Sequence, residues 1–173
     1  MELTQVLNPK MIVTHLNVDS KAETFNAMAE LFVKAGMVSD KAAYIKDVYE
    51  REAVGETGIG NYIAIPHGRS EAVVTPGVAI AVLDHEIEWE SLDGTGAKVV
   101  ILFAVTADNE GADEHLRMLA MFSKSLGNDA VVARLIGADT VDDVIRAFTE
   151  DAEEFESDAS GEAELDLDEL EIL

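Results

Sequence analysis

Two nearly continuous apolar runs constrain the fold of this chain more than any other feature of its sequence. They span residues 77–83 and 99–105, and both consist almost entirely of Val, Ile, Leu, Ala and Phe. Apolar runs of this length without alternation are typical of buried strands. Because helical segments are mixed with strands throughout residues 1–149, these runs indicate a single α/β layered domain.

The other elements are predicted from periodicity and from residues that begin or end helices. Residues 11–16 are β-branched and apolar and predict a first strand, and the alternation at 87–89 predicts a short edge strand. Ser20, followed by Glu23, predicts the start of a helix that ends at Gly36. Further helices are expected from Ser39 or Asp40 to about Arg51, at 112–126 after Asp108 and Asn109, at 129–136 and at 140–148.

The charge of the chain is strongly negative. Asp and Glu number 35 against 12 Lys and Arg, a net charge of −23, and residues 150–173 hold twelve of these acids and no base. Residues 1–149 therefore carry −11, which would repel a phosphate backbone and disfavours nucleic-acid binding. The composition resembles that of proteins from salt-loving organisms, and a generic acidic protein is the alternative. Residues 150–173 are predicted to be a disordered acidic tail, with a weak acidic helix at 165–170 as the alternative.

Several features indicate a cytoplasmic protein. The chain has no cysteine, so neither disulfides nor thiolate metal sites can form. Its longest apolar runs are about eight residues, too short to span a bilayer. The first residues lack the basic and then apolar pattern of a signal peptide. We therefore expect no membrane insertion.

A histidine is mounted in an unusual way after the apolar residues 62–65. Pro66 has a fixed φ and makes Ile65 extended, and His67 follows directly. Gly68 has no Cβ and is expected to leave room for another molecule's backbone or phosphate. These residues predict a reactive imidazole held at a strand end, although Pro-His-Gly is also the composition of an ordinary turn.

The remaining histidines are weaker candidates. No two of the four histidines have the short helical spacing of a metal-binding pair, so a metal site is disfavoured. No serine-nucleophile elbow, phosphate-binding loop or dinucleotide fingerprint occurs. His15, in a predicted strand, and His85, in a predicted polar turn, are expected to have structural or solvated roles.

Two further residues each have a structural and a functional interpretation. His115 begins an apolar stripe with Leu119, Phe122 and Leu126. Periodicity favours a core histidine, and the alternative is a ring at a cavity rim, in the first turn of a helix, where the positive helix end or burial keeps it neutral. Arg51, at the end of a predicted helix, is either a solvated partner of the helix dipole or a phosphate ligand.

A family resemblance joins these residues. The segments that carry it are Tyr49-Glu50-Arg51-Glu52, Thr57-Gly58-Ile59-Gly60, Ile63-Ala64-Ile65-Pro66-His67-Gly68 and His115-Leu116 with Leu119. In order and spacing, residues 5–149 resemble the IIA domain of the fructose/mannitol class of the phosphoenolpyruvate-dependent sugar phosphotransferase system.

The resemblance implies a fold and a chemistry. The fold would be a mixed sheet flanked by helices on both faces. His67 would accept a phosphoryl group from the histidine phosphocarrier protein, with Arg51 and His115 beside it, and pass it to a cysteine of a IIB component. No metal or cofactor would be needed, and an apolar rim around His67 is expected because both partners must dock there.

The resemblance leaves three functions open. The first is a phosphotransferase component for sugar uptake, with fructose expected. The second is a regulatory protein of the nitrogen-related type, whose phosphorylation state controls partners. The third is an interaction module in which the histidine is inert. The acidic tail has no counterpart in the family, and the chain lacks the IIB and IIC regions often fused to such domains, so it would act as a free carrier.

Overall fold

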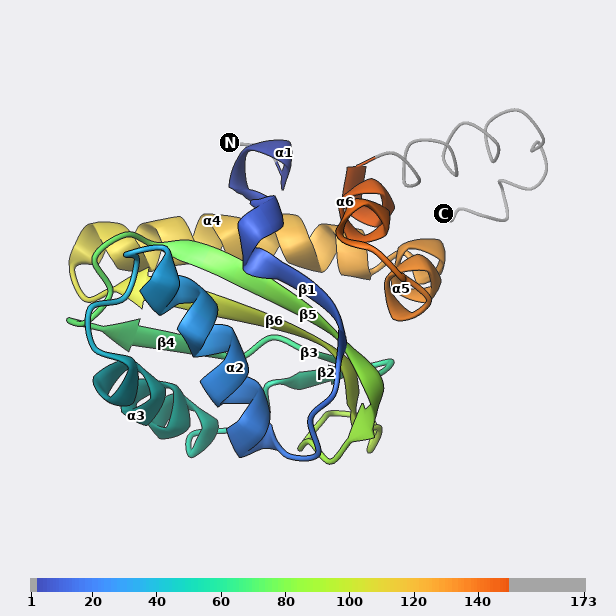
Figure 1. The fold of residues 1–173 in the computed structure, drawn as a ribbon, viewed down its shortest axis with the longest axis horizontal. Coiled ribbons are helices and arrows are strands. Elements are labelled where there is room, and N and C mark those ends of the chain that lie inside the picture. The colour runs from blue at the N-terminus through green and yellow to red at the C-terminus, as the bar shows by residue number, and fades with distance from the viewer. Residues whose placement is uncertain (1–2, 150–173) are drawn as a thin grey trace.

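Two long strands form the centre of the sheet in the computed structural model of this protein, which describes residues 3–149 (Figure 1). They are β5 (Gly77–Ile87) and β6 (Ala97–Thr106). The two strands pair antiparallel, from Gly77 opposite Ala104 to Ile87 opposite Ala97. Residues 78–83 and 99–105 are buried, which confirms that the two apolar runs are buried strands.

Four shorter strands complete a mixed sheet in the order β1-β5-β6-β3-β2, with β4 also paired to β6. Their bounds are β1 (Ile12–Leu16), β2 (Gly58–Gly60), β3 (Ile63–Ala64) and β4 (His67–Ser70). β1 is parallel to β5, β3 and β4 are parallel to β6, and β2 is antiparallel to β3. β2 was not predicted, because a glycine-rich segment carries no strand pattern.

Two predictions about the end of β5 are wrong. β5 continues through three exposed residues, 84–86, before Ile87 is buried again. His85 therefore lies in a strand and not in a turn, and residues 87–89 do not form a separate edge strand. The exposed residues have the polar composition of a turn, but they lie within β5, where its register with β6 is irregular between Val82 and Ile87.

Helices cover both faces of the sheet, as predicted (Figure 1). α2 (Lys21–Lys34) and α3 (Lys41–Glu52) pack on one face, over a core that contains Phe25, Phe32 and Tyr44. α4 (Asn109–Leu126), α5 (Asp129–Ile136) and α6 (Val141–Thr149) pack on the other, over a core that contains Phe103 and Phe122. Short α1 (Leu3–Val6) and the 3-10 helix η1 (Pro9–Met11) precede β1.

The helix ends follow from local chemistry. Ser20 Oγ accepts a hydrogen bond from Glu23 N at 3.2 Å, which confirms the predicted N-cap of α2. Gly36 ends the helix with φ +76°, where Met37 N donates to Phe32 O. Asp108 caps α4, which begins at Asn109, three residues earlier than predicted.

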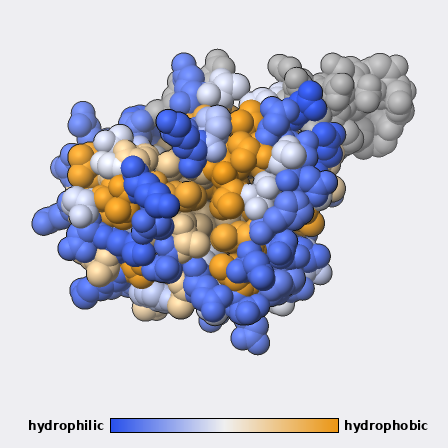
Figure 2. All heavy atoms as spheres, viewed as in Figure 1, coloured by the Kyte–Doolittle hydropathy of each residue, from blue (hydrophilic) through white to orange (hydrophobic). Residues whose placement is uncertain are grey.

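Figure 2 shows the molecule from the same side as Figure 1. On this face, hydrophobic residues gather near the middle and hydrophilic residues surround them. Within residues 3–149, no helix is long and apolar enough to cross a membrane. The predicted acidic tail at 150–173 lies outside the described residues, so its disorder stays a prediction.

Candidate functional site

His67 is the first residue of β4 and directly follows Pro66, which lies between β3 and β4. β3 and β4 both pair with β6, and the carbonyl oxygen of Pro66 accepts a hydrogen bond from Phe103 N at 3.1 Å. Pairing with β6 resumes at His67, which lies opposite Phe103. The stretch is therefore not a turn: His67 follows one strand and begins the next, and the sheet holds its backbone on both sides.

Gly68 does not have the predicted role. It is buried, and a Cβ built on it would lie 2.6 Å from Val48 Cγ2 and 2.9 Å from Tyr44 Cε1. Tyr44 also donates a hydrogen bond from its hydroxyl to Phe103 O at 2.8 Å, which anchors α3 on β6. The space above Gly68 is thus filled by α3 and not left for another molecule, because side chains alternate across a strand and His67 takes the opposite face.

His115, on α4, lies directly against His67. The two ring centroids are 4.4 Å apart, and the His115 ring also meets the Phe103 ring edge-on at 5.1 Å. His115 is 9% exposed, and neither of its ring nitrogens has a hydrogen-bond partner within the described part of the chain. The two interpretations of His115 therefore do not exclude each other: it is a buried residue of the apolar stripe, and it adjoins the candidate nucleophile.

The expectation that His115 lies in the first turn of its helix is wrong, because α4 begins at Asn109. Burial, and then the positive charge of Arg51, lower the pKa of His115. The neutral form of this ring is therefore favoured by the packing around it and by a neighbouring cation.

Arg51 lies in the last turn of α3, where its Nη1 donates to the carbonyl oxygen of Gly55 at 3.0 Å. Its charge also acts on both histidines. Burial lowers the pKa of His67 to about 4, with further contributions from His115 and from Arg51. The structure thus brings together all three residues singled out from the sequence, from three different elements.

This arrangement has a definite chemical capacity. At neutral pH the ring of His67 is uncharged, so a nitrogen lone pair is free to attack an electrophile. The nearby Arg51 guanidinium and the ring of His115 can donate hydrogen bonds to an electrophile that carries negative charge. The site suits the acceptance of an anionic group on nitrogen.

Phe103 was missed as a site residue. It backs the ring of His115 and pairs with His67, but in the sequence it is one more apolar residue of a buried run. Only the register between β4 and β6 makes it part of the site.

The other histidines lie elsewhere and are exposed. His15 contacts Asp84 at 3.4 Å and Asp139 at 3.2 Å, and His85 contacts Asp19 at 3.1 Å. These surroundings agree with the structural or solvated roles expected for both. No group of three or more His, Cys, Asp or Glu side chains within residues 3–149 is arranged to hold a metal ion.

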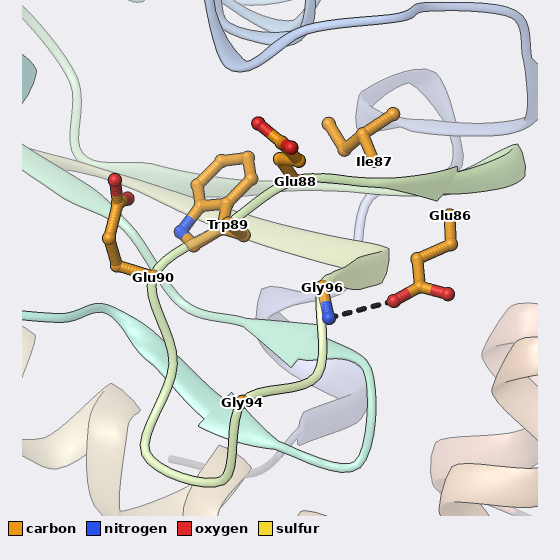
Figure 3. Close-up of a pocket in the computed structure, with 7 residues that line it drawn as sticks. All are labelled: Glu86, Ile87, Glu88, Trp89, Glu90, Gly94 and Gly96. Carbon is orange, nitrogen blue, oxygen red and sulfur yellow. Dashed lines mark hydrogen bonds between the residues drawn. The ribbon is translucent and has the colours of Figure 1, made fainter.

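A pocket of about 420 Å³ lies around the end of β5 and the loop before β6, and none of the three candidate residues lines it. Figure 3 shows Glu86, Glu88 and Glu90 along one segment, with Glu86 accepting a hydrogen bond from Gly96 N at 2.9 Å. Three carboxylates disfavour a phosphorylated ligand there.

Comparison with known proteins identifies the family. Residues 5–151 match the family described as phosphoenolpyruvate-dependent sugar phosphotransferase system, EIIA 2. The chain belongs to this family. The resemblance seen in the sequence is thereby confirmed, and the match leaves residues 152–173 outside it.

Proteins with different names are similar to this chain. A fructose-specific EIIA component of Haloferax volcanii is 34% identical over 76% of this chain and 86% of that protein. A nitrogen regulatory protein of Pseudomonas aeruginosa is 30% identical over 82% and 91%. The chain also matches the 2-O-alpha-mannosyl-D-glycerate-specific EIIABC component of Escherichia coli, 28% identical over 86% of this chain, but spans only 22% of the length of that relative.

Solved EIIA structures share the fold. The nitrogen regulatory protein IIA-Ntr of Neisseria meningitidis superimposes with a TM-score of 0.75 at 23% identity, over 84% of this chain and 97% of that one. The mannitol IIA enzyme of Escherichia coli, solved in complex with phosphorylated mannitol IIB, gives a TM-score of 0.69 at 24% identity, over 82% and 96%. The mixed sheet with helices on both faces is therefore shared with these solved IIA structures.

Proposed function

We propose that this protein is a phosphoryl carrier of a sugar phosphotransferase system, with His67 as the residue that is phosphorylated. The observation that carries the proposal is the His67 ring, whose centroid lies 4.4 Å from that of His115, a ring with no hydrogen-bond partner among residues 3–149. Burial, His115 and the charge of Arg51 lower the pKa of His67 to about 4, which favours its neutral form. Residues 1–149 form the carrier domain in this proposal, and residues 150–173 are an appended acidic tail.

The proposed reaction transfers a phosphoryl group from one imidazole to another. A neutral ring nitrogen of His67 attacks phosphorus on the phosphohistidine of the histidine phosphocarrier protein, through a loose, in-line transition state. A new N–P bond forms as the donor's N–P bond breaks, and the donor imidazole leaves with the electron pair. In the second step the cysteine sulfur of a IIB component attacks the same phosphorus, and His67 leaves as the neutral ring. Neither step requires a metal ion or a cofactor from this chain.

The neighbours of His67 supply positioning and charge stabilisation. Arg51 offers several N–H donors to the phosphoryl oxygens, and a neutral His115 can donate one N–H. Exposed Leu116, next to His115, and exposed Val54, three residues after Arg51, provide apolar surface near the site for docking partners.

The IIB partner is supported by the Escherichia coli mannitol IIA enzyme, whose structure contains phosphorylated IIB. Fructose is the first sugar to test, because the Haloferax volcanii relative is named fructose-specific. That relative also supports a salt-adapted protein, and a cytoplasmic location is part of our proposal. A regulatory role is the second candidate, because the Pseudomonas aeruginosa and Neisseria meningitidis relatives are named nitrogen regulatory proteins.

A reconstituted relay tests the proposal. The full chain is incubated with enzyme I, the histidine phosphocarrier protein and labelled phosphoenolpyruvate, and the labelled peptide is identified by mass spectrometry. We expect one acid-labile phosphate on the peptide that contains His67, none in His67→Ala, and parental labelling in His15→Ala, which removes an exposed histidine. Label that survives His67→Ala would refute the assignment of His67.

Addition of IIB components distinguishes the two roles. A transport component should pass its phosphate to a fructose IIB protein and support phosphorylation of fructose by the complete permease. Label that stays on this chain with every sugar IIB tested would favour the regulatory role.

A further inference from the structure

A chain of hydrogen-bonded polar groups connects the residue after Arg51 to Ile65, two residues before His67. Glu52 follows Arg51 in the last turn of α3, and its side chain is only 7% exposed. Glu52 Oε1 accepts a hydrogen bond from Lys21 Nζ at 2.7 Å, and Oε2 accepts one from Thr57 Oγ1 at 2.6 Å. Both carboxylate oxygens are therefore held, one by α2 and one by the segment before β2.

Thr57 is the centre of this chain. It is 3% exposed, its hydroxyl accepts a hydrogen bond from Trp89 Nε1 at 2.9 Å, and its carbonyl oxygen accepts one from Ile65 N at 2.9 Å. A threonine hydroxyl has one hydrogen, and Thr57 donates it in the hydrogen bond to Glu52. The same hydroxyl can therefore only accept from Trp89. Trp89, seen between Glu88 and Glu90 in Figure 3, is itself fixed edge-on against the Phe25 ring at 5.5 Å.

The two ends of this chain are adjacent to the two sides of the candidate site. On one side, Glu52 is covalently next to Arg51, whose guanidinium rests on Gly55 O in the loop that the Glu52–Thr57 bond closes. On the other side, Ile65 is separated from His67 by one proline, whose ring fixes φ and restricts movement of His67 relative to Ile65. Thr57 thus links the residue beside the cation to the segment before the nucleophile through hydrogen bonds of 2.6 and 2.9 Å.

We infer that Thr57 and Glu52 are positioning residues that hold Arg51 in register with His67. Neither reaches the reacting atoms. The inference rests on the proposed function, since it concerns the geometry of the same transfer. It makes the placement of Arg51 depend on the partly buried Lys21 in α2 and on the buried Trp89 after β5, rather than on the end of α3 alone.

Loss of the Thr57 hydroxyl should have two effects at the site. Thr57→Val keeps the side-chain shape but leaves Glu52 Oε2 and Trp89 Nε1 without their partner. The loop at residues 53–56, whose Gly55 carbonyl accepts the hydrogen bond from Arg51, should then relax. A displacement of about 1 Å at a catalytic group can cost roughly 10²-fold in rate. The pKa of His67 should rise, because Arg51 is one of the charges that hold it down.

The experiment compares three substitutions in the full chain. Thr57→Val is the test variant, Thr57→Ser restores the hydroxyl, and Thr24→Val is the matched control. Thr24 is fully buried in α2, and its hydroxyl donates to Ser20 O at 2.8 Å, so the control loses a comparable bond outside the site. The measurements are the rate of phosphoryl acceptance from the histidine phosphocarrier protein and the pKa of His67 from an NMR titration of its ring.

We expect acceptance by Thr57→Val to be about 10- to 100-fold slower, with a raised pKa of His67. Thr57→Ser should return both values toward those of the parent, and Thr24→Val should leave both unchanged. A folded Thr57→Val that keeps the parental rate and pKa overturns the inference, and so does a Thr24→Val that changes them equally.

Two further outcomes are also decisive. Should Thr57→Val fail to fold, Glu52→Gln replaces it under the same criteria, because an amide offers only one acceptor oxygen to Lys21 and Thr57 together. Should the parent accept no phosphate at all, the proposed function fails, and the titration of His67 still tests whether Thr57 holds Arg51 beside it.

Discussion

The depressed pKa of His67 should make the stability of the protein depend on pH in a way that one substitution removes. The unfolded chain protonates this ring near pH 6.5, and the folded chain only near pH 4. Between these values the unfolded state binds more protons, so stability is complete above pH 6.5 and is lost as pH falls toward 4. His67→Gln, which cannot be protonated, should lack this loss.

The expected magnitude follows from the two pKa values. Between pH 8 and pH 5, protonation of His67 in the unfolded state lowers the free energy of unfolding by about 2 kcal/mol. Solvent screening of a half-buried ring reduces this loss to roughly 1–2 kcal/mol. Over the same interval, the free energy of unfolding of the parent should therefore fall by that much more than the free energy of unfolding of His67→Gln. All other titrating groups contribute to both proteins and largely cancel in this difference.

Denaturant unfolding at pH 8 and pH 5, at one fixed salt concentration, measures the difference directly. His85→Gln serves as the control for loss of any histidine, because His85 is exposed in β5 and far in sequence from the site. An NMR titration of His67 should independently give a pKa near 4. Parallel stability losses in the parent and His67→Gln, together with a His67 pKa near 6.5, would refute the claim that burial and neighbouring charge keep this ring neutral.

Four further predictions concern the site, the fold and the charge. His115→Ala should slow phosphoryl transfer by roughly 10²–10³ while phosphate still arrives on His67, and a folded variant that transfers at the parental rate would contradict this role. Gly68→Ala should destabilise the fold by about 1–3 kcal/mol in denaturant unfolding, because the new methyl group meets Val48, and Val48→Ala added to it should recover part of the loss. A chain that ends at residue 149 should accept phosphate at the parental rate, and a tenfold loss, about 1.4 kcal/mol of barrier, would place the tail near the site. The thermal midpoint of that shortened chain should rise from low to molar salt, because screening weakens the self-repulsion of its −11 net charge, and an unchanged midpoint would remove the salt-adapted interpretation.

The elements that sequence reasoning predicted well are those specified by neighbouring residues. The run at 99–105 is a buried strand because β-branched and large apolar side chains fit no other environment as well. Ser20 and Gly36 delimit α2 because a side-chain acceptor and a left-handed backbone act within a few residues. The family motif likewise pointed to His67, Arg51 and His115 before any geometry was known.

Elements that depend on a distant partner were missed or wrongly interpreted. The glycine-rich β2 is a strand only because β3 pairs with it, and residues 84–86 belong to β5, whose pairing with β6 resumes beyond them at Ile87. Gly68 was expected to face another molecule, and its true neighbour, Val48, belongs to a helix twenty residues earlier in the chain. None of these partners can be inferred from local propensity.

The sequence by itself determined that this chain forms an α/β domain, where α2 begins and ends, and which histidine to suspect. Only the tertiary structure decided that His115 is buried against His67, that α3 fills the space above Gly68, and that Thr57 bonds to both Glu52 and Ile65. The physical reason is range. Propensity, capping and proline geometry act over a few residues, whereas burial, the pKa of His67 and the hydrogen-bond network arise from groups that meet only when the sheet has formed.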